Sequence, residues 1–212
     1  DKTIVHSDDF AKGKLDLQWQ WNHNPVDEAW SLTERKGYLR LKTSRIAQNL
    51  FMAPNTLTTR MEGPTCEAVV KMDVSQMKDG DVAGFAAFQG DAALLSVARE
   101  GKKWFVLGSK DNSVLSDEQK MVTDVKHEEV YRHALKSKTI YLKISCDFRE
   151  HKDLATLSYS LDGKNWTEAV SDFKMNFDYR RLFMGTRFAI YNYATKSAGG
   201  YVDIDCFGYS KK

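Results

Sequence analysis

The sequence has little proline, little cysteine and almost no net charge. Only 3 of its 212 residues are proline and 42% are hydrophobic, which excludes a disordered or collagen-like chain. The 31 basic and 29 acidic residues leave a formal charge of +2, so no strong field is available to attract nucleic acid as a partner. No apolar run approaches the roughly 18 residues needed to span a bilayer, so a membrane partner is not expected.

The cysteines and histidines are too few and too scattered for most metal or cofactor chemistry. Cys66, Cys146 and Cys206 each fall at an apolar position of an expected strand, and we interpret them as small buried hydrophobes rather than a disulfide framework. The 5 histidines lack zinc-ligand spacing. The sequence has no glycine-rich phosphate loop and no nucleophile elbow, so an organic cofactor is not expected.

Short runs of alternating apolar and polar residues recur along the chain. The clearest run covers residues 140–148, and similar runs cover 39–42, 66–74 and 201–207. Turn signals such as Asp162-Gly163 separate them. We therefore predict an all-β fold of two packed antiparallel sheets, a β-sandwich, in one domain spanning residues 1–212.

Two further segments, residues 15–22 and residues 111–138, contribute to the prediction of the fold. In the run 15–22, the large apolar residues Leu15, Leu17, Trp19 and Trp21 are expected on one face of a strand, and Asp16, Gln18, Gln20 and Asn22 on the other. The segment 111–138 is ambiguous: it contains either a short helix near 124–134 or an irregular edge strand followed by a loop. Alternation on the separate strands predicts a core that includes Trp19, Trp21, Leu39, Leu41, Val70, Met72, Leu142, Ile144, Ile190 and Ile204.

Acidic pairs near both ends suggest a metal site. Asp8 and Asp9 precede the first strand, and Asp203 and Asp205 lie in the last. If the terminal strands pair, calcium could bind Asp9 and Asp205, with Asp8 or Asp203 as an alternative donor. The other interpretation is a surface cluster of carboxylates. Asp203 and Asp205 also have the spacing of paired catalytic acids, but no third acid follows them, so we assign no catalytic residue.

Several motifs together resemble one known family. They are LQWQWNHNP at residues 17–25, WSL at 30–32, YLRL at 38–41, NTLTTR at 55–60, MKDGDVAGF at 77–85, YSLDG at 159–163, GTRFAIYNYATK at 185–196 and GGYVDIDCFGY at 199–209. This combination resembles the C-terminal concanavalin A-like domain of family-43 glycoside hydrolases. The resemblance covers essentially the whole chain, except for residues 111–138, and it implies a concanavalin A-like jelly roll.

The resemblance also implies a function in xylan or arabinan degradation. In that family catalysis belongs to an N-terminal propeller domain, against which the sandwich packs, and related modules bind xylan. The leading hypothesis is a non-catalytic module that binds xylan or arabinoxylan oligosaccharides made of β-1,4-linked xylose, in a secreted or periplasmic enzyme. Amides, guanidinium groups and rings suited to sugars are Gln20, Asn22, His23, Arg60, Gln89, Arg187, Tyr191 and Asn192, with Tyr193 as a further ring.

Two alternatives remain open from the sequence. The first is a structural docking domain that packs on the catalytic propeller and binds no sugar itself. The second is a stand-alone sandwich glycosidase or lyase, for which the chain offers only Asp203 and Asp205 as a convergent acid pair. Titration of the isolated chain with xylooligosaccharides distinguishes the binding module from the docking domain.

Overall fold

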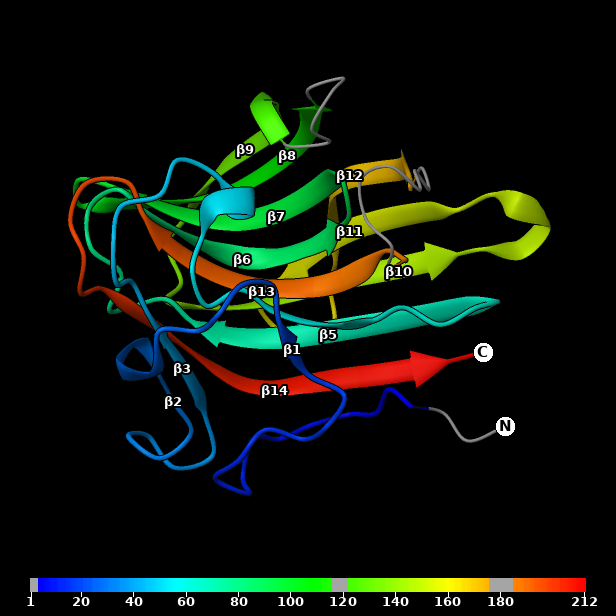
Figure 1. Ribbon diagram of the computed structural model, residues 1–212. Coiled ribbons are helices and arrows are strands. Elements are labelled where there is room, and N and C mark those ends of the chain that lie inside the picture. Colours follow the sequence, from blue (N-terminus) through cyan, green and yellow to red (C-terminus); the bar gives the residue numbers. More distant parts are fainter. Residues whose placement is uncertain (1–3, 116–121, 176–184) are drawn as a thin grey trace.

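Two antiparallel β-sheets of seven strands each make up the fold (Figure 1). The computed structural model describes residues 4–115, 122–175 and 185–212. Within these residues the only helices are the short 3-10 turns η1 (Asp27–Ala29), η2 (Leu50–Met52) and η3 (Arg149–His151). None of them is long and apolar enough to cross a membrane. The predicted all-β sandwich is confirmed.

The order of strands in both sheets departs from the order in sequence. The first sheet runs β1 (Gln20–Trp21), β4 (Leu57–Arg60), β13 (Arg187–Ala194), β6 (Asp81–Phe88), β7 (Asp91–Glu100), β8 (Lys103–Leu115) and β9 (Val122–Leu135). The second runs β12 (Thr167–Lys174), β11 (Leu154–Ser160), β10 (Thr139–Asp147), β5 (Thr65–Asp73), β14 (Tyr201–Lys211), β3 (Leu39–Lys42) and β2 (Trp30–Ser31). Each sheet therefore receives strands from both halves of the chain.

The alternation in β5 and β10 builds the centre of the core. Val70 is paired with Leu142 and Ala68 with Ile144, and all four side chains point between the sheets without solvent exposure. Every predicted core residue is buried except Trp21, which is half-buried and packs against Trp30 at a ring separation of 5.2 Å. The strand register therefore follows the apolar pattern, as expected when one face of a sheet is buried.

The prediction of one long strand across residues 15–22 is wrong. Leu17 is 103% exposed, whereas Gln18 is buried, and the strand β1 contains only two residues. The physical reason is hydrogen bonding: Gln18 accepts a bond from the backbone N–H of His6 and donates one to its carbonyl. This two-way bond ties down the N-terminal segment and overrides the apolar alternation.

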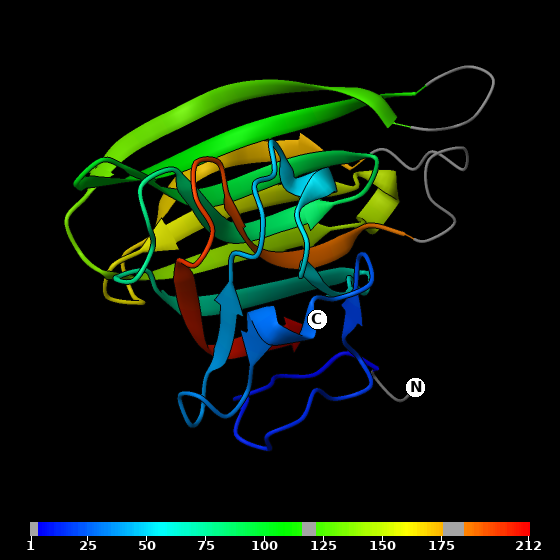
Figure 2. The ribbon, with the colours of Figure 1, turned by 60° about the vertical axis from the view of Figure 1, so that its left-hand side comes forward.

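The described residues of the ambiguous segment 111–138 form the strands β8 and β9, so the edge-strand alternative is confirmed and the helix is wrong. The strands β8 and β9 pair along most of their length, with two irregularities in register, and arch over one edge of the sandwich (Figure 2). Most described side chains of β9 are exposed, and Glu129 and Arg132 form an ion pair there. A charged edge strand that is exposed on both faces has no alternation, so the sequence pattern could not decide between the helix and the edge strand.

The outer face of the first sheet is covered in part by residues 44–56, which we call the covering segment. Leu50 and Ala53 of this segment pack on Ala189 and Tyr191 of β13, and all four are fully buried. The turn η2 of the covering segment, cyan in Figure 1, lies across this face of the sheet. The first sheet is therefore apolar on both sides around β6 and β13.

Candidate functional site

The eight residues predicted to bind sugar lie around β1, β4, β13 and β6 but do not share one surface. The register pairs Gln20 with Thr58 and Arg60 with Arg187, which places these side chains in the row that faces away from the second sheet. Gln20 and Arg60 are exposed, whereas Arg187 is only 6% exposed. Gln20, Arg60 and Arg187 therefore form one outward row, which we call the β1–β4–β13 row.

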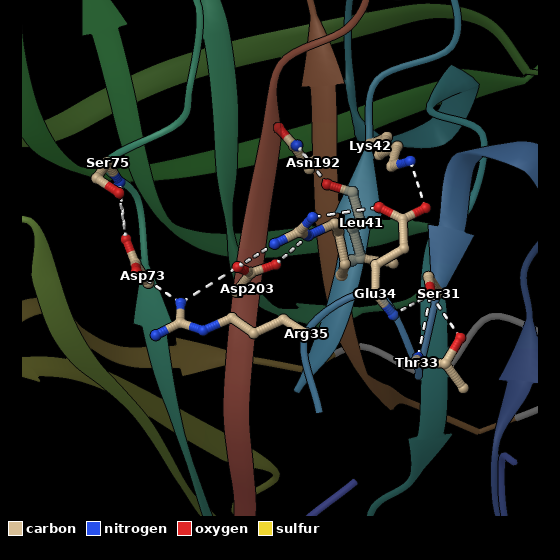
Figure 3. A network of polar contacts seen from close by, with 11 residues as sticks. Ser31, Thr33, Glu34, Arg35, Leu41, Lys42, Asp73, Ser75, Asn192 and Asp203 are labelled. Carbon is tan, nitrogen blue, oxygen red and sulfur yellow. Dashed lines mark hydrogen bonds and ion pairs between the residues drawn. The ribbon is translucent and has the colours of Figure 1, made fainter. Parts of the chain in front are cut away.

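Three other predicted residues are in the interior. The Nδ2 atom of Asn192 donates to the carbonyl of Leu41 in the second sheet at 3.0 Å and so connects the two layers (Figure 3). Tyr191 is fully buried with its hydroxyl 2.5 Å from that of Ser96, and burial raises its pKa well above the usual value. Gln89 is 2% exposed and accepts a bond from Thr186. In this conformation these side chains support the fold and reach little or no solvent.

The last two predicted residues hold the covering segment. The imidazole Nε2 of His23 lies 2.8 Å from the carbonyl oxygen of Phe51, and the backbone N–H of Asn22 donates to the carbonyl of Thr56 at 2.9 Å. The side chain of Asn55 adds two bonds to the backbone of Val26. The polar run after Trp21 therefore fastens residues 44–56 over the sheet.

Thr58 fixes the position of the buried arginine. Its hydroxyl accepts a hydrogen bond from Nε of Arg187 at 2.9 Å and donates one to the carbonyl of Gln20 at 2.9 Å. The pKa of the Arg187 guanidinium is lowered by burial and, secondarily, by the positive charge of Arg60. Thr58 was not identified from the sequence, because its role depends on the pairing of three strands.

The outer face of the second sheet carries a network of charged residues around Asp203 (Figure 3). Arg40 binds both carboxylate oxygens of Asp203 at 2.8 and 3.1 Å, and Arg35 bridges Asp203 and Asp73 at 3.2 and 2.9 Å. The bond with Asp203 raises the pKa of the Arg40 guanidinium. Both oxygens of Asp203 are thus engaged, which favours a structural role over proton transfer or metal binding.

The residues predicted to bind calcium lie where the N-terminal segment meets β14. Asp8 and Phe207 form a β-bridge, which brings the N-terminal segment beside β14. The oxygens of Asp8 accept bonds from the backbone of Phe10 and from Nε1 of Trp19, at 2.8 and 2.9 Å. Across the described residues there is no group of three or more possible metal ligands. Asp9 and Asp205 alone would leave most of the oxygens that calcium requires to carbonyls and water, so calcium stays a prediction.

A pair formed by a buried carboxylate and an exposed histidine on the first sheet was missed by the sequence analysis. Asp111 of β8 is opposite His127 of β9, and Nδ1 of the imidazole forms a hydrogen bond with the buried carboxylate. This bond, followed by the charges of Asp111 and Glu129, raises the pKa of His127 despite partial burial. Both residues lie in the segment that had no clear strand pattern.

The hairpin predicted at Asp162-Gly163 connects β11 and β12. Oδ1 of Asp162 accepts bonds from the backbone N–H groups of Lys164 and Asn165, both at 2.8 Å, and Gly163 has a φ of 76°. A groove of about 740 Å³ lies between this hairpin and the end of β9, lined in part by Tyr159 and Leu161. The carboxylate of Asp162 is used to build the turn.

Comparison with known proteins gives consistent relatives. The chain is 32% identical to a β-xylosidase of Formosa agariphila, over 95% of this chain and 34% of the relative, and 30% identical to a putative β-xylosidase of Xylanibacter ruminicola, over 81% and 28%. A solved structure described as a bifunctional GH43-CE protein of Bacteroides eggerthii is 41% identical with a TM-score of 0.88, over 99% of this chain and 26% of that one.

A second solved structure extends the similarity. It is an engineered GH43 glycoside hydrolase described as having endo-xylanase and exo-arabinofuranosidase activity, 28% identical with a TM-score of 0.89, over 99% of this chain and 41% of that one. The chain thus spans well under half the length of each of these proteins. The family model of the β-xylosidase C-terminal concanavalin A-like domain matches residues 7–210. The chain therefore belongs to the family of β-xylosidase C-terminal concanavalin A-like domains.

Proposed function

We propose that this chain is a non-catalytic accessory domain of a xylan-acting glycoside hydrolase and that its β1–β4–β13 row contacts the xylose chain. The observation that carries the proposal is the composition of that row: the exposed amide of Gln20 and the exposed guanidinium of Arg60 lie on one face beside Arg187. Planar groups of this kind donate and accept the hydrogen bonds that sugar hydroxyls offer. The names of the xylosidase relatives support xylan as the polymer.

The hydrogen bonds that Asp203 accepts support the proposal that this domain is not catalytic. A catalytic carboxylic acid has to exchange a proton with the glycosidic oxygen or attack the sugar. Asp203 instead accepts three hydrogen bonds from two arginines and is almost fully buried. The proposal also places the domain in a secreted or periplasmic enzyme, in the compartment where polymeric xylan is present.

The rival function is a docking domain that packs on a catalytic propeller and binds no sugar. This function is favoured by the hydrogen bonds of the predicted sugar-binding residues. The side chains of Asn192, Tyr191 and His23 all bond to other residues of the same chain. A docking domain needs its polar residues for the fold and for one protein interface. A sugar-binding domain also needs polar groups that remain open to solvent.

Calorimetric titration of the chain with xylohexaose separates the two functions. We expect saturable heat with the intact chain and weaker binding after Gln20→Ala, because the amide is an exposed hydrogen-bonding group of the row. The matched control is Asn165→Ala, an exposed amide in the hairpin of the other sheet. Absence of heat, together with binding of the chain to the parent catalytic domain added separately, would support docking instead.

A further inference from the structure

Two arginines lie directly opposite each other on neighbouring strands. Arg60 of β4 is the register partner of Arg187 of β13, and both side chains face away from the second sheet. Directly opposite residues have Cβ atoms roughly 4.5–5.5 Å apart, and like charges in this position repel. The pair therefore destabilises the sheet unless an anion neutralises it.

No such anion comes from the part of the chain that the structure describes. Thr58 is the only hydrogen-bond partner of the Arg187 side chain among the described residues, and Arg60 forms no ion pair with them either. Other arginines of the same protein differ: Arg40 binds Asp203, and Arg132 binds Glu100. Because Arg187 is 6% exposed, its charge is removed from most of the water that would otherwise stabilise it.

The geometry of the pair suits a small planar anion. Thr58 occupies Nε of Arg187 and so fixes the guanidinium plane, and the two Nη groups have no hydrogen-bond partner among the described residues. Two guanidinium groups side by side offer parallel N–H donors, the arrangement that recognises a carboxylate. The exposed position of Arg60 opens the pair to solvent on one side.

The surroundings of the pair suit a sugar better than a protein side chain. Phe88 of β6 is the other register partner of Arg187 and is itself buried, but its ring lies 5.3 Å from that of Phe51, which is only half-buried. Gln20 is exposed on the other side of Thr58. A ring face and an amide beside a cationic pair match the apolar face, the hydroxyls and the carboxylate of an acidic sugar.

We propose that Arg60 and Arg187 form a binding site for the carboxylate of a uronic acid carried as a substituent on the xylose chain. The proposal rests on the proposed contact between the β1–β4–β13 row and xylan. It adds a specificity: the domain selects acidic regions of the polymer over neutral ones. Arg187 supplies the fixed half of the site and Arg60 the accessible half.

The test is a calorimetric titration with three probes at low salt. They are a neutral xylooligosaccharide, the same oligosaccharide carrying one glucuronic acid, and that acidic oligosaccharide after reduction of its carboxyl group to an alcohol. We expect the acidic probe to bind about 10-fold more tightly than the other two, as hydrogen bonds to a charged group predict. The preference should shrink as salt concentration rises.

Variants assign the preference to the pair. Arg60→Gln and Arg187→Lys should each reduce the ratio between acidic and neutral affinities towards one, with folding checked by thermal melting. Arg149→Gln, an exposed arginine in the turn η3, is the matched control and should keep the ratio. The pH should stay near neutral, where the glucuronic acid is ionised.

Four other outcomes of these titrations would overturn part or all of the proposal. Equal binding of acidic and neutral probes overturns the uronic acid site and leaves the proposed xylan contact standing. Binding of no probe overturns both. An acidic preference that survives both Arg60→Gln and Arg187→Lys overturns the assignment to this pair. Binding to the parent catalytic domain that weakens with Arg60→Gln, without any acidic preference, shows that the pair takes a protein carboxylate instead.

Discussion

The imidazole of His127 donates to the buried carboxylate of Asp111 across the β8–β9 pair, while most of its own ring stays in contact with solvent. A buried carboxylate on an outer sheet face needs a partner, and a histidine supplies one whose charge changes near neutral pH. The contact therefore makes the stability of this edge depend on pH.

The first prediction concerns that dependence. Because the folded pKa of His127 is raised, its contribution to the free energy of unfolding is complete below the unfolded value of about 6.5 and is lost as pH rises through the folded pKa. Melting of the chain and of His127→Gln between pH 5 and 9 should show the largest difference at the acidic end. A difference that does not vary with pH would contradict this.

A second pH dependence is predicted at Asp81, where burial of the carboxyl group, not a bond to a charged partner, shifts the pKa. This carboxyl group is fully buried and accepts one bond from the backbone N–H of Lys78 at 2.8 Å, and its Oδ1 has no partner among the residues that the structure describes. Burial raises its pKa to about 6. Stability is therefore highest while Asp81 is protonated and falls between about pH 4 and 6, because the unfolded state ionises first.

Asp81→Asn tests this directly, since an amide keeps the acceptor but cannot ionise. At pH 7 the variant should be more stable by about 1–3 kcal/mol, and the gain should disappear near pH 4. Urea denaturation at a series of pH values measures it. A variant that is less stable than the wild type at every pH would rule out the buried charge as the cause.

The core predicts a contrast between two leucines. Leu142 of β10 has no solvent exposure, so Leu142→Ala should cost roughly 2–5 kcal/mol through lost burial and the remaining cavity. Leu17→Ala should change stability by less than about 0.5 kcal/mol, because Leu17 is fully exposed. Chemical denaturation of both variants gives the comparison. Equal losses would mean that the two positions are wrongly placed.

Removal of calcium is expected to lower the melting temperature if Asp9 and Asp205 share an ion. The β-bridge between Asp8 and Phe207 would then be strengthened by a crosslink between the two ends. Melting with chelator and with added calcium measures the shift, and Asp205→Asn should abolish it. An identical melting temperature in both conditions excludes the site.

The chain by itself should hydrolyse no glycosidic bond. The assays are aryl xyloside, aryl arabinofuranoside and xylan with the isolated chain. The expected result follows from Asp203, whose oxygens are held by Arg35 and Arg40. Turnover that survives purification and disappears in Asp203→Asn or Asp205→Asn would show that the accessory-domain proposal is wrong.

The sequence predicted the parts of the fold that depend on local pattern. Alternation in 140–148 and the turn at Asp162-Gly163 were sufficient to identify β10 and its neighbours, because one face of these strands is buried. The short strand β1 was misread, since the two bonds between Gln18 and His6 are not visible as a pattern. For the edge strand β9 the sequence left a short helix and an irregular edge strand as alternatives, because both faces of this strand carry polar residues.

The candidate site could be predicted from the sequence less well than the fold. Arg60 and Arg187 were each identified as polar residues in strands, but their pairing joins segments far apart in the chain and depends on the strand order. The same holds for Asp203, which the sequence analysis had left available for catalysis or for calcium binding. Its bonds with Arg35 and Arg40 also join segments far apart in the chain. Non-local register decides whether a polar side chain is open or already bonded, and no local pattern encodes it.

The covering segment has a consequence for how this domain tolerates mutation. Every residue of β13 is buried: one side of the strand faces the second sheet, and on the other side Ala189, Tyr191 and Tyr193 pack with Leu50 and its neighbours. After Arg187, the strand has no solvent-facing position where a charge or a larger side chain can be accepted at little cost. In a library of single substitutions β13 should form a continuous block of intolerant positions, whereas β10 should tolerate changes at every second residue.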